Sequence, residues 1–489
     1  MAHSLKAPYI GFMRLFPTLL PAVLLAAAAA SAPSSAQSAP GLSPAERREG
    51  AAANPQLTAQ FGGEYKGPQA AYVRNVGRRI AAQSGLAARP EDYTVTLLNS
   101  NINNAFAIPG GYVYVTRQLV ALMNDEAELA FVLGHEVGHV AARHADKRAK
   151  RSGLAGLGAA ILGAVTGSSI IGDLAGTGAQ LYSLNYSRDQ EREADSLGVR
   201  YLVRAGYDPD ASGDILAELG AQTSLEGRLS GQGGREPAPW LSTHPANAER
   251  VARIRKEAAA QAVSTGRATN RDAFLDAIDG MAYDDDPEQG VVNGGRFRHA
   301  GLGLAFDAPQ GFALQNSPSS VTGSRQGGGR FSFGGGQVAG NDLSAYAASV
   351  WNGLGVRPPE MRPRRINGLD AMIGETRVQR QGSTVDASVV AYQWAPGSFY
   401  HIVMIAPPDG LAAFAPLIES VRRLSPGEAA STRGRRVKVV RVAPNDTVAS
   451  LAARMAYNDD QVARFTVLNG ITPQTRLAPG SRVKLIVAS

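Results

Sequence analysis

The amino-acid sequence predicts an α+β protein of several domains, and three observations support this. Its 489 residues are too many for one ordinary hydrophobic core. Residues 37–262 alternate helix-like apolar periods with one β-like stretch, whereas the apolar runs of residues 295–424 are mostly β-like. Residues 435–489 have a strand–helix–helix–strand pattern of their own. We therefore expect three folded domains, joined by linkers at residues 263–294 and 425–434.

The chain begins with a predicted secretory signal peptide, residues 1–36. Lys6 and Arg14 precede an apolar run at residues 15–30, and the small residues up to Ala36 suit cleavage after it. The run is short and is followed by an Ala/Ser/Pro-rich stretch, which favours a cleaved signal over a retained membrane anchor. We therefore expect an exported protein.

The residue composition narrows the chemistry available to the chain. It contains no cysteine, which excludes disulfides, lipid attachment through cysteine and zinc held by thiolates. Any zinc ion must then be bound by histidine and carboxylate side chains, as in hydrolytic sites. The net charge of +7 is modest for this length and is spread along the chain, so we expect no nucleic-acid binding.

The motif H-E-x-x-H at residues 135–139 has the spacing of half a catalytic metal site. In a helix, residues four apart lie on the same face, so His135 and His139 can bind one metal ion. Glu136 then lies beside the open coordination position, where it can act as a general base. The Asn-Asp pair at 124–125 can cap the start of this helix. A chance occurrence of the pattern is the alternative.

An acidic segment further along the chain offers a third ligand. Ser187 and Gln190 form a predicted capping box, which starts a new helix. Within it, Glu191 and Asp195 lie one turn apart on one face, whereas Glu193 points elsewhere. One of the two carboxylates can bind a metal ion while the other orients a ligand imidazole. A solvated acidic helix face is the alternative.

Together these motifs resemble a known family. H-E-x-x-H, followed by E-x-x-A-D within "SRDQEREADSLG", is similar to the zinc metallopeptidases that include HtpX, the CAAX prenyl proteases and the periplasmic BepA-like proteases. Three further segments fit that resemblance: "NAFAIPGGYVYVTRQLV" (104–120), "GHEVGHVAARH" (134–144) and "STHPANAERVARI" (242–254). The resemblance covers about residues 45–260 and implies a gluzincin-type mixed α/β domain.

The resemblance implies a complete hydrolytic site. His135, His139 and Glu191 are expected to bind one zinc ion (Zn2+) per chain, and Asp195 to orient a ligand imidazole. Zinc lowers the pKa of a bound water from about 15.7 towards 7. Glu136 is expected to accept the proton of that water and to pass it to the leaving amine.

The same resemblance suggests where a substrate binds. In related peptidases an edge strand holds the substrate backbone by β-augmentation. A purely structural strand is the alternative. The corresponding residues here are Gly111, Tyr112, Val113 and Tyr114.

Three further side chains have predicted roles. His244, which precedes a proline, is expected at the site as an oxyanion donor, or as a fourth zinc ligand that keeps the enzyme idle. Arg250 is expected to support the same site. His144 lies five residues past His139, so we expect it to turn away from the metal and to be structural.

The segment 152–181 is rich in Gly, Ala, Leu and Ile, and Asp173 is its only charged residue. A transmembrane helix is one interpretation, but the many glycines and the internal acid disfavour it. We expect instead a mobile or amphipathic loop beside the active site, with peripheral membrane contact as part of that hypothesis.

Residues 435–489 resemble a LysM module, through "APNDTVASLAARM" and "VLNGITPQTRLAPGSRVKLIV". That family binds N-acetylglucosamine polymers such as peptidoglycan in a groove between two loops. The matching residues are Asn445, Asp446, Thr447, Leu468, Asn469, Gly470 and Ile471. Asn445 stands where the family more usually has Gly. A small basic domain with an internal role is the alternative.

Together these expectations indicate a periplasmic zinc endopeptidase that cleaves misfolded or misassembled cell-envelope proteins. Its C-terminal domain would tether it to peptidoglycan, and cell-wall or membrane association follows. A peptidoglycan-binding chaperone or scaffold with a latent protease domain is the alternative, and a peptidoglycan hydrolase is a third. The intact Glu136 argues against a dead enzyme. For residues 295–424 we expect a small α/β sandwich with a substrate-recruiting or scaffolding role.

Overall fold

The computed structural model describes residues 41–87, 89–147, 186–229, 240, 244, 248–261, 267–337, 340–380 and 383–489. The predicted signal peptide and the segment 152–181 lie outside these residues. Among the helices that are described, none combines the length and the apolar character needed to cross a membrane.

A three-stranded sheet organises the first part of the chain. Its strands are β1 (Thr94–Leu98), β2 (Ala105–Ile108) and β3 (Tyr112–Thr116), in the order β1-β3-β2. The central strand, β3, runs parallel to β1 and antiparallel to β2. The prediction that residues 111–114 form an edge strand is therefore wrong. Gly110 and Gly111, both at positive φ, turn the chain back so that β3 pairs antiparallel with β2.

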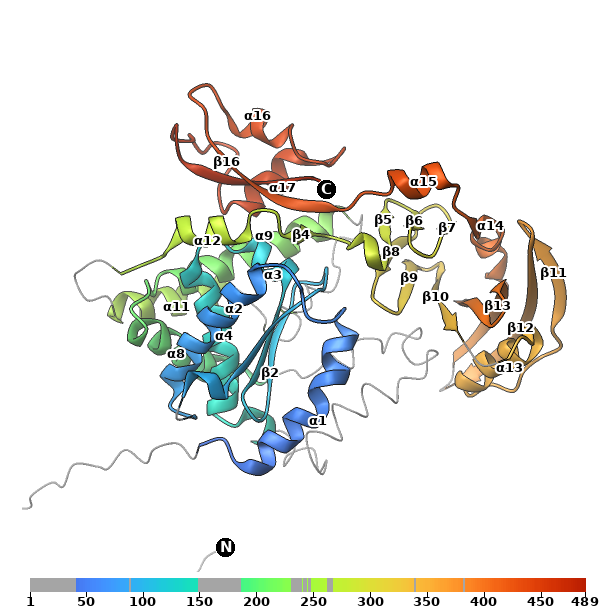
Figure 1. The fold of residues 1–489 in the computed structure, drawn as a ribbon, viewed down its shortest axis with the longest axis horizontal. Helices are drawn as coiled ribbons and strands as arrows, with labels where there is room; N and C mark the ends of the chain where they lie inside the picture. The colour runs from blue at the N-terminus through green and yellow to red at the C-terminus, as the bar shows by residue number, and fades with distance from the viewer. Residues whose placement is uncertain are drawn as a thin grey trace, which may run out of the picture. The chain divides into compact units, whose positions relative to one another are not determined.

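Helices cover both faces of this sheet (Figure 1). Val113 and Val115 share one hydrophobic core with α2 (Gln69–Ala81) and α4 (Glu126–Ala141). Tyr114 points to the opposite face, where it packs with Leu57 of α1 (Pro44–Gln60). The short α3 (Arg117–Leu122) follows β3 directly.

Two helices that are distant in sequence meet closely at the centre of this region. The α4 helix begins at an Asp125 cap, and α8 (Arg188–Arg204) begins at the expected capping box of Ser187 and Gln190. A Cβ atom on Gly138 of α4 would lie only 3.1 Å from the carbonyl oxygen of Ala194 in α8. Glycine at this position therefore permits the close approach that brings the Glu191 end of α8 to the H-E-x-x-H face of α4. The helices α9 (Ala211–Leu229) and α11 (Ala248–Gln261) pack against this pair.

The region 295–424 is dominated by antiparallel strands. A seven-stranded sheet has the order β11-β12-β13-β14-β10-β9-β8, and a four-stranded sheet has the order β15-β7-β6-β5. One helix, α13 (Leu343–Gly353), packs against the larger sheet through Trp351, and a shorter helix, α14 (Ala415–Ser420), lies further along the chain. The strands are β5 (Val291–Asn293), β6 (Arg296–His299), β7 (Leu304–Asp307), β8 (Ala313–Asn316), β9 (Ser320–Arg325), β10 (Gly329–Gln337), β11 (Arg362–Ile366), β12 (Leu369–Arg380), β13 (Ser383–Ala395), β14 (Ser398–Ala406) and β15 (Arg422–Arg423).

The C-terminal region has the expected strand–helix–helix–strand order. Its elements are β16 (Arg435–Arg441), α16 (Val448–Ala452), α17 (Gln461–Leu468) and β17 (Arg482–Ala488). Its apolar side chains belong to the same core cluster as those of α2 and α4. Lys484 of β17 is fully buried, and its Nζ donates to the carbonyl oxygens of Ala121 (2.8 Å), Leu122 (3.0 Å) and Met123 (2.5 Å). This region is therefore packed onto the first part of the chain.

The stretch expected to be a linker, residues 263–294, is packed where the structure describes it. Its helix α12 (Arg271–Ile278) buries Phe274 completely. Its strand β4 (Ala282–Tyr283) pairs with β16 as a third strand. Asp284 accepts a hydrogen bond from the Tyr457 hydroxyl at 2.7 Å. The linker prediction is wrong for this part, because its helix buries Phe274 and its strand pairs with β16. The second expected linker contains one short helix, α15 (Pro426–Ser431).

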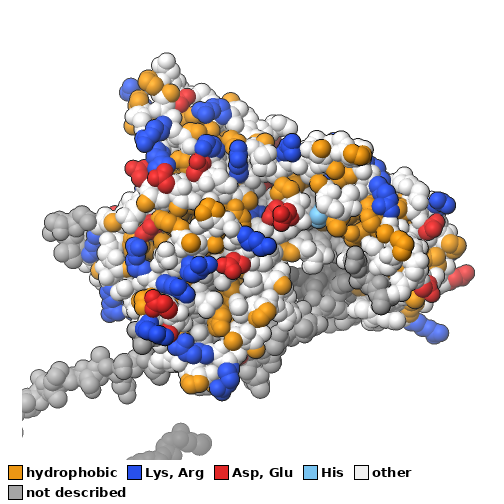
Figure 2. Space-filling model, in the orientation of Figure 1, with side chains coloured by type: hydrophobic (Ala, Val, Ile, Leu, Met, Phe, Trp, Pro, Cys, Tyr) orange, Lys and Arg blue, Asp and Glu red, His pale blue; other side chains and the backbone are white. Residues whose placement is uncertain are grey.

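The charged side chains are mixed on the face drawn in Figure 2. Lys and Arg are interspersed there with Asp and Glu, and apolar side chains lie singly or in small groups between them. On this face the basic side chains are thus distributed and do not form one basic patch.

Candidate metal centre

Four side chains from three parts of the chain converge on one point. His135 and His139 come from α4, Glu191 from the first turn of α8, and His244 from the segment between α9 and α11. All four are buried, and their nearest nitrogen and oxygen atoms lie within 4.8 Å of one another. The sequence predicted this set, and the structure brings it together.

The distances between these atoms fit a zinc ion. The Nε2 atoms of His135 and His139 are 3.0 Å apart, and Glu191 Oε1 lies 3.4 Å from His139 Nε2. His244 Nδ1 lies 3.2 Å from His135 Nε2 and 2.8 Å from Glu191 Oε1. Zinc bonds of about 2.0–2.1 Å in tetrahedral geometry place ligand atoms roughly 3.3 Å apart. Two imidazoles, a carboxylate and a third imidazole thus form a donor set suited to zinc.

The general-base candidate, Glu136, is held by a residue that the sequence did not single out. Trp240 Nε1 donates to Glu136 Oε1 at 3.0 Å, and the indole stacks on the His244 ring with centroids 4.9 Å apart. His244 Nε2 lies 3.5 Å from the same Glu136 oxygen. The backbone N–H of His244 donates to the Trp240 carbonyl. A lone tryptophan in a sequence more often signals core packing, so its contact with Glu136 became visible only in the structure.

Asp195 and Arg250 contact the converging side chains. Asp195 Oδ1 lies 3.0 Å from His135 Nδ1, on the side of the ring away from the other ligands. Arg250 donates to both oxygens of Asp195, at 2.9 Å and 2.7 Å, and to the carbonyl oxygen of His244 at 2.9 Å. Its Nη1 also lies 3.1 Å from Glu191 Oε2. One guanidinium therefore fixes groups from both α8 and the His244 segment.

The electrostatics favour a neutral His139 and ionised carboxylates at Glu191 and Asp195. Burial lowers the pKa of His139 well below its ordinary value, so its ring is neutral. Burial opposes the charge of Glu191, but the neighbouring histidines, His244 foremost, hold the pKa of this carboxyl below its usual range. Burial likewise opposes the charge of Asp195, and Arg250 is the main cause that keeps its pKa low.

His144 does not turn away from the metal centre. Its Nδ1 lies 2.8 Å from Nδ1 of His139, and its Nε2 lies 3.1 Å from Glu193 Oε2. The prediction assumed that the helix continues past its last histidine, whereas Arg143 has a left-handed φ of 52° that redirects the chain. Glu193 points away from the four converging atoms, as expected, but it reaches His144.

The residues matched to glycan binding have varied surroundings. Asn445 and Thr447 are exposed, and Asp446 Oδ2 accepts from the backbone of Ala443. Asn469 is buried and bonds the backbone of Phe465 and Lys484. In the same loop Leu468 is buried and Ile471 half-buried, both in the core shared with α2 and α4. A Cβ atom on Gly470 would lie 2.1 Å from Glu218 of α9. The second loop therefore faces the rest of the chain.

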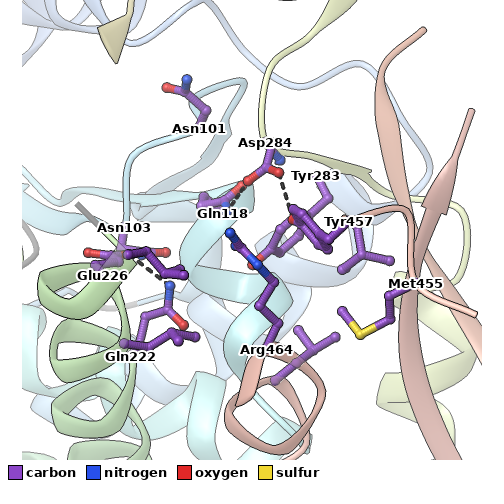
Figure 3. Close-up of a pocket in the computed structure, with 14 residues that line it drawn as sticks. Asn101, Asn103, Gln118, Gln222, Glu226, Tyr283, Asp284, Met455, Tyr457 and Arg464 are labelled. Carbon is purple, nitrogen blue, oxygen red and sulfur yellow. Dashed lines mark hydrogen bonds between the residues drawn. The ribbon is translucent and has the colours of Figure 1, made fainter. Parts of the chain in front are cut away.

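A polar cavity of about 170 Å³ lies between α9, β4 and the C-terminal elements. Gln222 and Glu226 of α9 form one wall, and Arg464 and Met455 the opposite one (Figure 3). Asn103 joins this cavity to the metal centre, because its side chain donates to Glu226 while its carbonyl oxygen accepts from the backbone of Trp240.

Comparisons with known proteins relate part of the chain to peptidases. Residues 68–258 match the model of Peptidase family M48, which confirms the resemblance predicted from the motifs. The chain is 30% identical over 196 residues to a beta-barrel assembly-enhancing protease of Yersinia pestis, covering 38% of each chain. It is 35% identical over 159 residues to the mitochondrial metalloendopeptidase OMA1 of Arabidopsis thaliana, covering 32% of this chain and 30% of that one. The chain thus spans less than two fifths of the length of these relatives.

Proposed function

We propose that this chain, whose residues 68–258 form a Peptidase family M48 domain, is a zinc-dependent metalloendopeptidase that acts on proteins of the bacterial cell envelope. The observation that carries the proposal is the buried convergence of His135, His139 and Glu191, with Glu136 beside them. A donor set of two imidazoles and one carboxylate is the one used by zinc hydrolases of this kind.

The roles of the residues follow from their positions. His135, His139 and Glu191 would hold the zinc ion, which supplies a Lewis acid and water of lowered pKa. Glu136 accepts a proton from the attacking water and passes it to the leaving amine. Asp195 and Arg250 keep the ligands in place.

His244 gives the site a closed arrangement. Its Nδ1 lies 2.8 Å from Glu191 Oε1 and 3.2 Å from His135 Nε2, so it would be close enough to bind a zinc ion held by the other three side chains. Of its two expected roles, this favours a fourth ligand that keeps the enzyme idle over an oxyanion donor. Substrate cleavage then requires His244 to leave this position, together with Trp240, which stacks on it. The closed arrangement also supports the second candidate, a chaperone or scaffold whose protease domain is latent.

The edge strand β2 is a better candidate than β3 for binding the substrate backbone. Among the described strands, β2 pairs only with β3 and so forms an edge of the sheet. Its start adjoins the active site, because Asn103 bonds Trp240 just before the strand and α4 packs against it. We propose that an extended substrate segment pairs with residues 105–108 of β2.

The substrate class and the location are inferred from the relatives and the sequence. Proteases named for enhancing beta-barrel assembly support misfolded or misassembled envelope proteins as substrates. The predicted signal peptide supports export to the periplasm. Peptidoglycan tethering by residues 435–489, a recruiting role for residues 295–424 and membrane contact through 152–181 complete the proposal, with no nucleic-acid partner.

One comparison tests the catalytic proposal. Residues 37–489 are purified with zinc, and cleavage of an unfolded protein such as reduced casein is compared between the wild type and Glu136→Gln, which keeps the shape but removes the base. We expect cleavage by the wild type and a loss of at least a hundredfold in the variant. Equal cleavage by the wild type and Glu136→Gln contradicts the endopeptidase proposal. Cleavage by neither the wild type nor His244→Ala also contradicts it, and that result favours the chaperone or scaffold.

A further inference from the structure

The second nitrogen of His139 has an unexpected partner. A histidine that binds zinc through Nε2 leaves its Nδ1–H to be satisfied by the protein. For His135 the Asp195 carboxylate lies on that side, with Oδ1 3.0 Å from Nδ1. For His139 it is another imidazole, because His144 Nδ1 lies 2.8 Å from His139 Nδ1. His144 is completely buried, so among the described residues this contact has no competition from solvent.

A second contact completes a chain of three side chains. His144 Nε2 lies 3.1 Å from Glu193 Oε2, and Lys147 Nζ lies 3.7 Å from the same oxygen. The Glu193 side chain is half exposed, at 51% of its reference area, so the chain runs from the buried centre to the surface. The sequence motifs assign neither His144 nor Glu193 a role at the metal.

The local backbone is built to bring His144 into this position. The helix α4 ends at Ala141, and the left-handed φ of Arg143 swings the next residue back beneath His139. The carbonyl oxygen of His144 then accepts a hydrogen bond from Gln190 Nε2 at 3.3 Å. Gln190 is itself fixed by the capping box at the start of α8. His144 is thus held through its backbone as well as its ring.

The hydrogen-bonding needs of the two imidazole rings allow one arrangement of protons when His139 binds metal. Two facing Nδ1 atoms need exactly one proton between them, since two would repel and none would leave no bond. If His144 donated, His139 would carry its proton on Nε2 and could not bind metal through that atom. If His139 donates, its Nε2 is free for zinc, and His144 can donate its own Nε2–H to Glu193. Every ring nitrogen is then satisfied.

We infer that His144 and Glu193 are positioning residues, which set the tautomer and the ring orientation of the zinc ligand His139. The inference rests on the proposed zinc site but extends it to two residues that act through another. Loss of such partners typically weakens metal binding by about 10–100-fold. Because Glu193 lies further from the metal and is half exposed, its removal should weaken binding less than removal of the His144 acceptor.

Zinc affinity, measured by competition with a chromophoric chelator, tests the inference without relying on catalysis. His144→Phe keeps a ring but removes the acceptor, and we expect zinc binding to weaken by about 10–100-fold. His144→Asn can offer its amide oxygen near the Nδ1 position, so it should recover part of that loss. Glu193→Ala should weaken binding about threefold to tenfold, and Glu193→Gln, which keeps an acceptor, less than twofold. His299→Phe, which replaces a histidine of the 295–424 region, is the matched control and should bind zinc normally.

The visible spectrum of the cobalt-substituted protein adds a readout that a purely structural role would not move. We expect His144→Phe to shift the cobalt absorption bands, and His144→Asn to restore them in part. If His144→Phe does not fold, as judged by circular dichroism of the metal-free protein, His144→Asn and Glu193→Ala decide the matter. Zinc affinities within twofold of the wild type in every folded variant overturn the inference. A wild type that binds zinc but cleaves nothing contradicts the proposed function and leaves this inference standing.

Discussion

Replacing Gly138 by alanine tests the close helix contact on which the metal centre depends. The added Cβ would lie 3.1 Å from the Ala194 carbonyl oxygen and 3.2 Å from Leu197 Cβ, both in α8. Both neighbours are rigid parts of a packed helix, so the two helices must separate by a few tenths of an ångström. Overpacking of this kind costs about 1–3 kcal/mol.

The same substitution at Gly220 is the matched control. Gly220 is also inside a helix, α9, and a Cβ there meets no described atom within 4 Å. Alanine is favoured over glycine in a helix by about 1 kcal/mol, and this gain applies at both positions. Gly220→Ala should therefore stabilise the protein, whereas Gly138→Ala should be about 1–3 kcal/mol less stable than Gly220→Ala.

Two assays measure the effect of Gly138→Ala on stability and on zinc binding. Urea unfolding of the metal-free proteins, monitored by circular dichroism, measures the stability difference. Zinc competition measures whether the separation of α4 and α8 also moves Glu191 away from His135 and His139, and we expect affinity to fall only in Gly138→Ala. Equal stabilisation by both substitutions, with zinc affinity unchanged, would refute the claim that this glycine contact sets the geometry.

Three other predictions concern the residues around the site and the other two regions. Trp240→Phe removes the hydrogen bond from the indole to Glu136, which contributes about 0.5–1.5 kcal/mol to the closed arrangement. Basal cleavage of casein should therefore rise about twofold to tenfold. Unchanged or lower cleavage contradicts the proposal that Trp240 restrains the site. Lys484→Met leaves three buried carbonyl oxygens without their donor and should lower the free energy of unfolding in urea by about 3 kcal/mol. Lys438→Met, at an exposed position, should change it little. Equal unfolding midpoints for the two variants would contradict the packing of the C-terminal region onto the first part of the chain. Burial lowers the pKa of His401 to about 4, so at this site the folded protein binds fewer protons than the unfolded chain between pH 6.5 and 4. As the pH falls through that range, the free energy of unfolding should therefore decrease by up to about 3 kcal/mol. His401→Asn should flatten this pH dependence in tryptophan-monitored unfolding, and an unaltered slope argues against the prediction.

Helix periodicity predicts which side chains share a face, and the family resemblance identifies the metal ligands among them. H-E-x-x-H places His135 and His139 together, and the one-turn spacing of Glu191 and Asp195 does the same on α8. The capping residues, Asp125 and Ser187, also act locally, so their prediction needed no tertiary information.

The errors arose where the outcome depends on distant partners. Strand alternation predicts β3 but not its central place in the sheet, because strand order is decided by tertiary pairing. The role of His144 depends on a single left-handed residue, Arg143, that no periodicity signals. The acidic run at 284–286 has the composition of a linker, yet Asp284 bonds Tyr457, which lies far along the chain.

Metal stoichiometry tests the central claim most directly. The wild type and Glu191→Gln are dialysed against the same zinc buffer and then analysed for metal by mass spectrometry, with the exposed Glu249→Gln as the control. The account predicts one zinc ion per chain in the wild type and in Glu249→Gln, and far less than one in Glu191→Gln. Zinc retained equally by all three proteins, or absent from the wild type, would contradict it.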